Sequence, residues 1–175
     1  MKMHSIFRLI ILSGLIISTY SSIYATDRIS GNSADTIAEV IGMKTSFDSI
    51  IVVRFRNGTD ILEGLKQTGK MFNLKNAVIL TGIGSVTSYH LHSVDNSTFP
   101  SENVFLKEEN PSDITNISGY FINGRLHAHI TLSDELRAIG GHLEPGTKVF
   151  KFCVITIGIL PDEIDISRYD DKTWR

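Results

Sequence analysis

Cysteine is nearly absent from this 175-residue chain, which contains only Cys153. A single cysteine excludes a disulfide bond within the chain, and with it a small fold that depends on disulfide bridges. Cys153 lies inside the apolar stretch 149–155, a pattern typical of a buried strand. We therefore expect its thiol to pack as a small apolar side chain.

An excess of positive charge is also missing. The chain has 17 Lys and Arg against 19 Asp and Glu, a formal net charge of −2. If residues 1–25 are removed, Lys2 and Arg8 leave with them, and the balance becomes 15 − 19 = −4. A protein that binds nucleic acid by neutralising phosphates carries the opposite sign, so nucleic acid is a disfavoured partner.

A hydrophobic run of transmembrane length is missing as well, since a spanning helix needs about 20 apolar residues. Lys2 and Arg8 give a positive start, residues 6–17 are almost wholly apolar, and small residues follow at 21–25, which is the layout of a secretory signal peptide. We predict a signal peptide over 1–25 with cleavage after Ala25, and an uncleaved anchor is the alternative. The mature protein is then expected to be exported, periplasmic or extracellular, and free of the membrane.

The remaining residues predict a leader or linker over 26–45, a single domain over 46–160 and a charged C-terminal tail over 161–175. Runs of β-branched and alternating apolar residues predict strands at 49–56, 77–80, 86–94, 104–106, 114–122, 125–133 and 148–159. One helix is expected after Asp60, whose carboxylate can cap it. Many strands with one helix indicate an α+β fold with a mostly antiparallel sheet.

Two glycine-containing segments are expected to be turns. Asn123-Gly124 separates two strand runs, and this pair favours a type I′ hairpin because both residues tolerate positive φ. Gly82-Ile83-Gly84-Ser85 is interpreted as a tight turn between two strands. It lacks the third glycine of a dinucleotide-binding loop and the Gly-Lys-Ser/Thr of a P-loop.

A pair of histidines on one strand is the clearest chemical signal in the sequence. Alternate side chains of a strand share a face, so Ala128 and Ile130 face the core while His127 and His129 lie on the opposite face. Two imidazoles at positions i and i+2 are about 7 Å apart at their bases and can lean toward one cation. Zn²⁺ binds such nitrogens at about 2.0–2.1 Å.

His142 is the expected third ligand, because Gly140-Gly141 allows the backbone before it to approach another strand closely. His90 and His92 form a second alternating pair and are candidates for an additional ligand site. The sequence thus predicts a site for Zn²⁺ or another divalent transition metal at His127, His129 and His142. The alternative is that these side chains only hydrogen-bond to neighbours on a polar face.

Signals for catalysis are weaker. A hydrolytic metal site needs an open coordination position and a nearby carboxylate, and only Asp134 and Glu135 are close in sequence. No nucleophile elbow, His-Glu-x-x-His helix or two-carboxylate pattern is present. A binding module is therefore favoured over a metal-dependent enzyme, and no catalytic residue is assigned.

Several ordered segments resemble a known family. They are Ala77-Val78-Ile79-Leu80-Thr81-Gly82-Ile83-Gly84-Ser85-Val86, Ile117-Ser118-Gly119, Leu126-His127-Ala128-His129-Ile130 and Gly140-Gly141-His142-Leu143. Their order is similar to that of the PPC domain, named for plants and prokaryotes conserved and also catalogued as domain of unknown function 296. The single-domain prokaryotic type, which has no AT-hook, is the form that this chain resembles.

The resemblance implies an α+β domain with a bent, mostly antiparallel sheet and one main packed helix, assembled as a homotrimer. It also implies that His127, His129 and His142 correspond to the histidines of the family motif, which are suited to a metal or an unknown small ligand near a subunit boundary. The family carries a DNA-binding label from plant members with an AT-hook. This chain has no Arg-Gly-Arg-Pro hook, so DNA binding is the less favoured hypothesis.

Overall fold

The computed structural model describes residues 40–171. The predicted signal peptide at 1–25, most of the predicted leader and the last residues of the tail lie outside these described residues. From Lys44 onward the described residues belong to one compact unit, and those before it belong to a different unit. The elements are β1 (Ser49–Arg56), α1 (Ile61–Met71), β2 (Ala77–Val94), β3 (Asn103–Glu108), β4 (Ser112–Ile122), β5 (Arg125–Ser133), β6 (Ala138–Leu143), β7 (Lys148–Ile159) and a short 3₁₀ helix, Ser167–Asp170.

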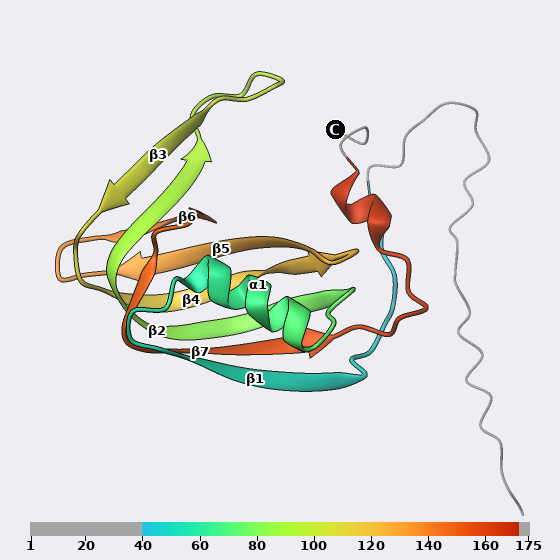
Figure 1. The fold of residues 1–175 in the computed structure, drawn as a ribbon. Helices are drawn as coiled ribbons and strands as arrows, with labels where there is room; N and C mark the ends of the chain where they lie inside the picture. The colour runs from blue at the N-terminus through green and yellow to red at the C-terminus, as the bar shows by residue number, and fades with distance from the viewer. Residues whose placement is uncertain (1–39, 172–175) are drawn as a thin grey trace, which may run out of the picture. The chain divides into compact units, whose positions relative to one another are not determined.

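Seven antiparallel strands form one sheet in the order β1-β7-β2-β4-β5-β6, with β3 and also β6 paired to the C-terminal part of β2. The sheet is strongly curved, α1 lies across one face of it, and the end of β2 continues with β3 into a two-stranded arm (Figure 1). The predicted α+β class and the mostly antiparallel sheet with one main helix are confirmed.

Helix α1 begins where the sequence predicts it. The Asp60 carboxylate accepts a hydrogen bond from the backbone N–H of Glu63, which satisfies one of the free donors of the first turn. Ile61 and Leu65 of this helix are completely buried against the sheet. Burial of each such side chain contributes about 1.5–3 kcal/mol to folding, so α1 is held by its apolar face.

The core lies between α1 and the concave side of the sheet. Its largest fully buried side chains come from nearly every element: Ile61, Leu65, Ile79, Tyr89, Leu91, Ile117, Phe121, Ile130, Leu132, Leu143, Ile155 and Ile157. Cys153 is also fully buried within a strand, as predicted. On β5 the alternation is as expected, because Ala128 and Ile130 are buried while His127 and His129 are exposed.

One expectation about the backbone is wrong. The segment Gly82-Ile83-Gly84-Ser85 is not a turn, since it lies in the middle of the single long strand β2. Register shifts between β2 and β7 occur on either side of it. A Cβ atom on Gly84 would lie 2.1 Å from the carbonyl oxygen of Phe152. The glycine therefore permits a close approach of neighbouring strands where the sheet bends, and it does not end the strand.

The Asn123-Gly124 hairpin is confirmed, with φ angles of 51° and 76° at the two residues. Beyond the predicted domain end at residue 160, a small apolar cluster joins Ile122, Leu160 and Ile166, so part of the expected peripheral tail packs on the domain. No helix among residues 40–171 is long and apolar enough to cross a membrane.

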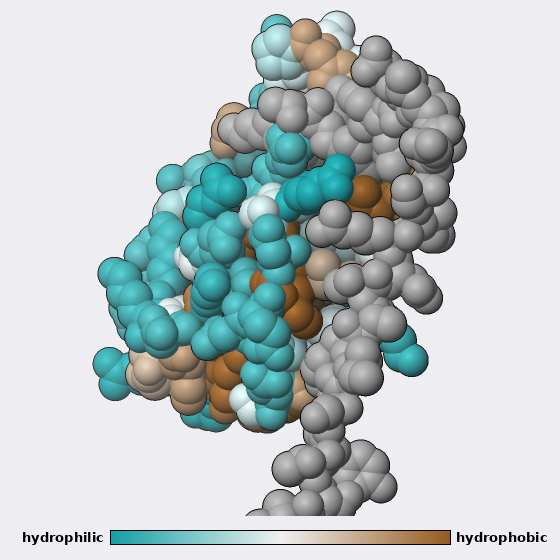
Figure 2. Space-filling view, turned by 90° about the vertical axis from the view of Figure 1, so that its right-hand side faces the viewer, coloured by the Kyte–Doolittle hydropathy of each residue, from teal (hydrophilic) through white to brown (hydrophobic). Residues whose placement is uncertain are grey.

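The surface of the domain is mixed in character. Hydrophilic residues dominate the side drawn in Figure 2, and hydrophobic residues reach the surface between them in a narrower band. Exposed apolar side chains include Val52 on β1 and Phe105 on β3, which are 66% and 58% accessible. Phe105 lies beside the histidines described next, so the arm and the candidate site share one surface.

Candidate metal centre

Three neighbouring strands place three histidines side by side. In the antiparallel register His92 of β2 pairs with His142 of β6, and His142 in turn pairs with His129 of β5. Residues directly opposite each other in an antiparallel pair project from the same face, with Cβ atoms about 4.5–5.5 Å apart. His142 is therefore the central member of the row.

His127 joins this row from the same strand as His129. The Nε2 atoms of His127 and His129 are 3.1 Å apart, and the two rings stack with centroids separated by 5.1 Å. At such a distance one nitrogen donates its proton to the other, or both nitrogens face a shared cation. The convergence of the two side chains is the geometry expected from their i, i+2 spacing.

His142 meets the other histidines in two different ways. Its ring stacks on that of His92 at a centroid distance of 4.5 Å. It lies nearly perpendicular to the rings of His127 and His129, with centroid distances of 4.9 and 5.5 Å and interplanar angles of 85° and 79°. Four imidazole rings therefore occupy one patch of the sheet face.

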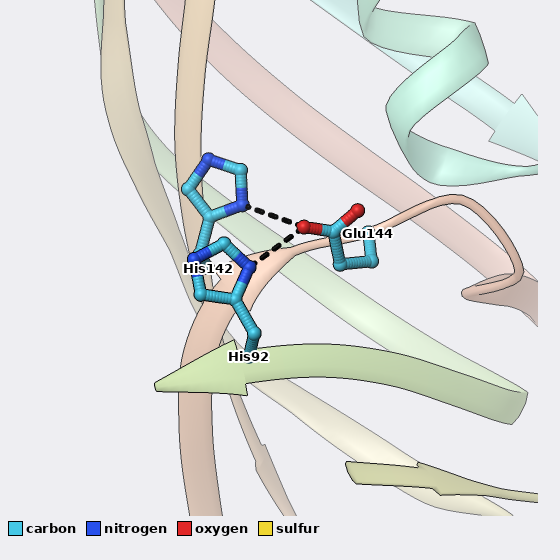
Figure 3. Close-up of side chains that lie close together, drawn as sticks. All are labelled: His92, His142 and Glu144. Carbon is cyan, nitrogen blue, oxygen red and sulfur yellow. Dashed lines mark hydrogen bonds and ion pairs between the residues drawn. The ribbon is translucent and has the colours of Figure 1, made fainter. Parts of the chain in front are cut away.

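Glu144 completes the cluster just after β6. One of its carboxylate oxygens, Oε1, lies 2.7 Å from Nδ1 of His92 and 3.4 Å from Nδ1 of His142, so both rings point toward it (Figure 3). Ligand atoms of His92, His142 and Glu144 all lie within 4.8 Å of one another. Within the part of the chain that the structure describes, the buried Nδ1 of His142 has no hydrogen-bond partner.

Glycine explains how β6 approaches β2 closely enough to form the cluster. A Cβ atom at position 141 would lie 2.5 Å from the carbonyl oxygen of His92, a contact that a real side chain does not make. At Gly140 the corresponding distance, to the carbonyl oxygen of Ile130, is 3.1 Å. The glycine pair therefore allows the contact with another strand that the sequence predicted, and Gly141 is the residue at which it is closest.

The electrostatic setting favours neutral imidazoles. Loss of hydration lowers the pKa of His142, and the nearby His92 and His127 lower it further, while Glu144 acts in the opposite direction. Loss of hydration is also the main reason why the pKa of His129 is lowered, with His127 as the next cause. A neutral imidazole is the form that binds a metal ion, so both side chains are held in their ligand form at neutral pH.

Not every residue singled out in the sequence reaches the cluster. His90 turns away, because its Nδ1 lies 2.9 Å from the carbonyl oxygen of Pro145. Asp134 accepts hydrogen bonds from the backbone N–H groups of Leu136 and Arg137, and so it stabilises the turn between β5 and β6. These contacts give Asp134 a structural role at the turn.

Sequence reasoning missed Glu144, and it gave His92 less weight than His127, His129 and His142. The sequence signal that could have identified Glu144 is the segment Gly-Gly-His-Leu-Glu, which puts an acidic residue two positions after His142. The long-range pairing of β2 with β6 has no local sequence signal. Four imidazoles and one carboxylate are donors that suit a borderline transition-metal ion such as Zn²⁺.

The fold and this cluster define a class: an α+β domain whose curved antiparallel sheet displays a histidine and carboxylate cluster. The model of the Plants and Prokaryotes Conserved (PCC) domain matches residues 43–161, and the chain therefore belongs to that family. This is the family that the sequence resemblance indicated under the name PPC.

Two solved structures with the same fold have 19–20% sequence identity to the chain. A metal-containing protein from Archaeoglobus fulgidus is 20% identical, with a TM-score of 0.59 over 69% of this chain and 86% of its own. A plant- and prokaryote-conserved protein from Pyrococcus horikoshii is 19% identical, with a TM-score of 0.59 over 71% and 87%.

A third structure, from Bacteroides thetaiotaomicron, is described as that of a candidate DNA-binding protein. It is 20% identical to the chain, with a TM-score of 0.55 over 68% of this chain and 85% of its own. Among curated proteins, none matches the sequence.

Proposed function

We propose that this protein is a binding module that holds a divalent transition-metal ion on the histidine face of its sheet. The observation that carries the proposal is the buried Nδ1 atom of His142, which has no hydrogen-bond partner among residues 40–171 and lies beside two further ligand atoms. This atom is 3.4 Å from the Glu144 carboxylate but makes no hydrogen bond with it. A buried polar atom without a hydrogen bond costs about 1–3 kcal/mol, and a bound cation would offset that cost.

The proposed ligands combine the three histidines predicted from the sequence, His127, His129 and His142, with His92 and Glu144. Zinc is the metal that we propose, because it accepts imidazole and carboxylate ligands and imposes little geometric preference of its own. The relative from Archaeoglobus fulgidus, described as metal-containing, supports the proposal of a bound metal ion by similarity, without naming the metal.

Metal content tests the proposal. Protein purified without a histidine tag and dialysed against zinc is expected to retain the metal, as measured by inductively coupled plasma mass spectrometry. His142→Ala is expected to bind zinc at least about 100-fold more weakly. Mutation of a residue that only hydrogen-bonds to a metal ligand already lowers metal affinity 10–100-fold. His90→Ala is the matched control and is expected to behave like the unsubstituted chain. A metal-free protein that takes up no zinc would rule the function out.

Export and self-association complete the proposal. The segment 1–25 is proposed to be a signal peptide, and mass spectrometry of the mature protein is expected to find Thr26 as its first residue. A homotrimer is proposed on the strength of the family, and sedimentation equilibrium is expected to give three times the mass of the mature chain. A monomer at micromolar concentration would contradict the trimer and leave the metal proposal standing.

DNA binding is the second candidate, because the relative from Bacteroides thetaiotaomicron is described in that way. The observation against it is the acidic balance of the chain. Binding through phosphates weakens steeply with salt, so a gel-shift assay at low salt is the sensitive test. Absence of a shift of duplex DNA under these conditions would eliminate this candidate.

A further inference from the structure

The histidines form two pairs that converge on different points. His127 and His129 converge through their Nε2 atoms, whereas His92 and His142 converge through Nδ1 on the carboxylate of Glu144. We propose that the cluster holds two divalent cations in each chain, with His142 as a ligand of both. This inference rests on the proposed metal-binding function and specifies the number of ions and their ligands.

The first position lies between His127 and His129. In a tetrahedral zinc site, two nitrogens that are each 2.0–2.1 Å from the metal lie about 3.3 Å from each other. The observed 3.1 Å between the two Nε2 atoms is close to that separation. The ring of His142 lies nearly perpendicular to both, with centroids 4.9 and 5.5 Å away. Its Nδ1 faces Glu144, so we assign its other nitrogen, Nε2, to this cation.

The second position is bounded by the Nδ1 atoms of His92 and His142 and by the carboxylate of Glu144. These three ligand atoms lie within 4.8 Å of one another, and both rings point to the same carboxylate oxygen (Figure 3). Glu144 supplies the negative charge that the first position lacks. An oxygen and two nitrogens leave room for water to complete the coordination.

If both cations bind to His142, its imidazole ring must lose the proton of its N–H group. A neutral imidazole has one N–H group and one free nitrogen, so it can bind the first cation without losing a proton. Binding of the second cation breaks the remaining N–H bond, and the proton passes to the solvent while the electron pair forms the new bond between nitrogen and metal. The anionic ring and Glu144 together offset two of the four positive charges.

Stoichiometry tests the inference, because each arrangement predicts a different number of ions. Titration of the full mature chain with Co²⁺ or Zn²⁺ is expected to give two ions per chain. Glu144→Gln and, separately, His92→Ala are expected to reduce the number to one, and so is the double variant His127→Ala/His129→Ala. His90→Ala is expected to keep two.

With two Co²⁺ ions on one ring, magnetic coupling is expected to weaken the electron paramagnetic resonance signal as the second ion binds. One ion per chain in the unsubstituted protein would overturn the two-ion inference and leave the metal function intact. No bound ion would overturn both. Two ions retained by both Glu144→Gln and His92→Ala would also overturn the inference, and far-UV circular dichroism verifies that each variant is folded.

Discussion

Nδ1 of His92 lies 2.7 Å from the carboxylate of Glu144, although the two residues are 52 positions apart in the chain. The contact links the arm-forming part of β2 to the turn after β6. Both side chains are only about one-fifth accessible, at 21% and 22%, so water screens the interaction only in part. The pair therefore serves two purposes, because it connects distant segments and places two ligand atoms together.

Loss of this contact is expected to destabilise the metal-free protein. Glu144→Ala is predicted to lower the free energy of unfolding by about 1.5–3 kcal/mol, the usual range for a hydrogen bond to a charged group. Urea denaturation in the presence of a chelator measures this quantity. Glu109→Ala is the control, because its side chain is exposed and its removal is expected to change stability by less than about 0.5 kcal/mol. Equal effects of the two substitutions would contradict the role given to Glu144.

A second polar cluster is expected to make stability depend on acid pH. The Tyr89 hydroxyl donates a hydrogen bond of 2.6 Å to Glu108, and Arg137 forms an ion pair with the same carboxylate. The hydrogen bonds from Tyr89 and Arg137 lower the pKa of Glu108. A lowered carboxylate pKa stabilises the fold above the ordinary value of about 4.3, and this contribution is lost as the pH falls through the lowered pKa.

Thermal melting of Glu108→Gln measures that contribution. The variant is expected to melt several degrees below the unsubstituted protein at pH 7, and the gap is expected to narrow steadily below about pH 4. Glu63→Gln removes an exposed ion pair with Lys66 and is expected to show little gap at any pH. A Glu108→Gln gap that stays constant down to pH 2 would show that the carboxylate is not linked to folding in this way.

Cys153 is expected to be chemically inert in the folded protein. Burial raises the pKa of its thiol to about 12, and the thiolate is the reactive form. Iodoacetamide at pH 8 is therefore expected to leave the native protein unlabelled and to label it fully in 6 M guanidinium chloride. Mass spectrometry reads both results, and rapid labelling without denaturant would show that β7 opens readily.

A methyl group at position 141 is expected to separate β6 from β2. Gly141→Ala would bring Cβ within 2.5 Å of the His92 carbonyl oxygen, and overpacking of this kind costs about 1–3 kcal/mol. The variant is predicted to lose stability and to bind zinc more weakly, because His92 and His142 move apart. Gly140→Ala, where the nearest contact is 3.1 Å, is expected to have the smaller effect on both. A larger drop in melting temperature for Gly140→Ala than for Gly141→Ala would be evidence against this account.

Much of the fold could be predicted from local patterns. Strands β1, β5 and β7 begin and end at the predicted residues, because each is a β-branched or alternating run bounded by turn residues. The exposed positions of His127 and His129 also followed from alternation alone. The continuity of β2 could not be predicted, since Gly82 and Gly84 are as compatible with a turn as with a tightly packed bend.

The candidate site was predictable only where its residues share a strand or a short segment. His127 and His129 have a fixed spacing, so their convergence needs no tertiary information. His92 reaches His142 through strand pairing between distant parts of the chain, and that register depends on the whole sheet. Glu144 lies after β6, where its direction is set by the turn leading to β7 and not by strand alternation.

Strand β2 pairs with β3, β4, β6 and β7, so it is the hub of the sheet. Two of these partners come from the last third of the described chain, and contacts over such sequence separations slow folding. During synthesis, His90 and His92 are made before β6 and β7. The two histidines gain their neighbours only after those strands have been synthesised. The proposed metal site can therefore form only late in folding, and before that the exposed strand edges of β2 are most open to pairing with other chains.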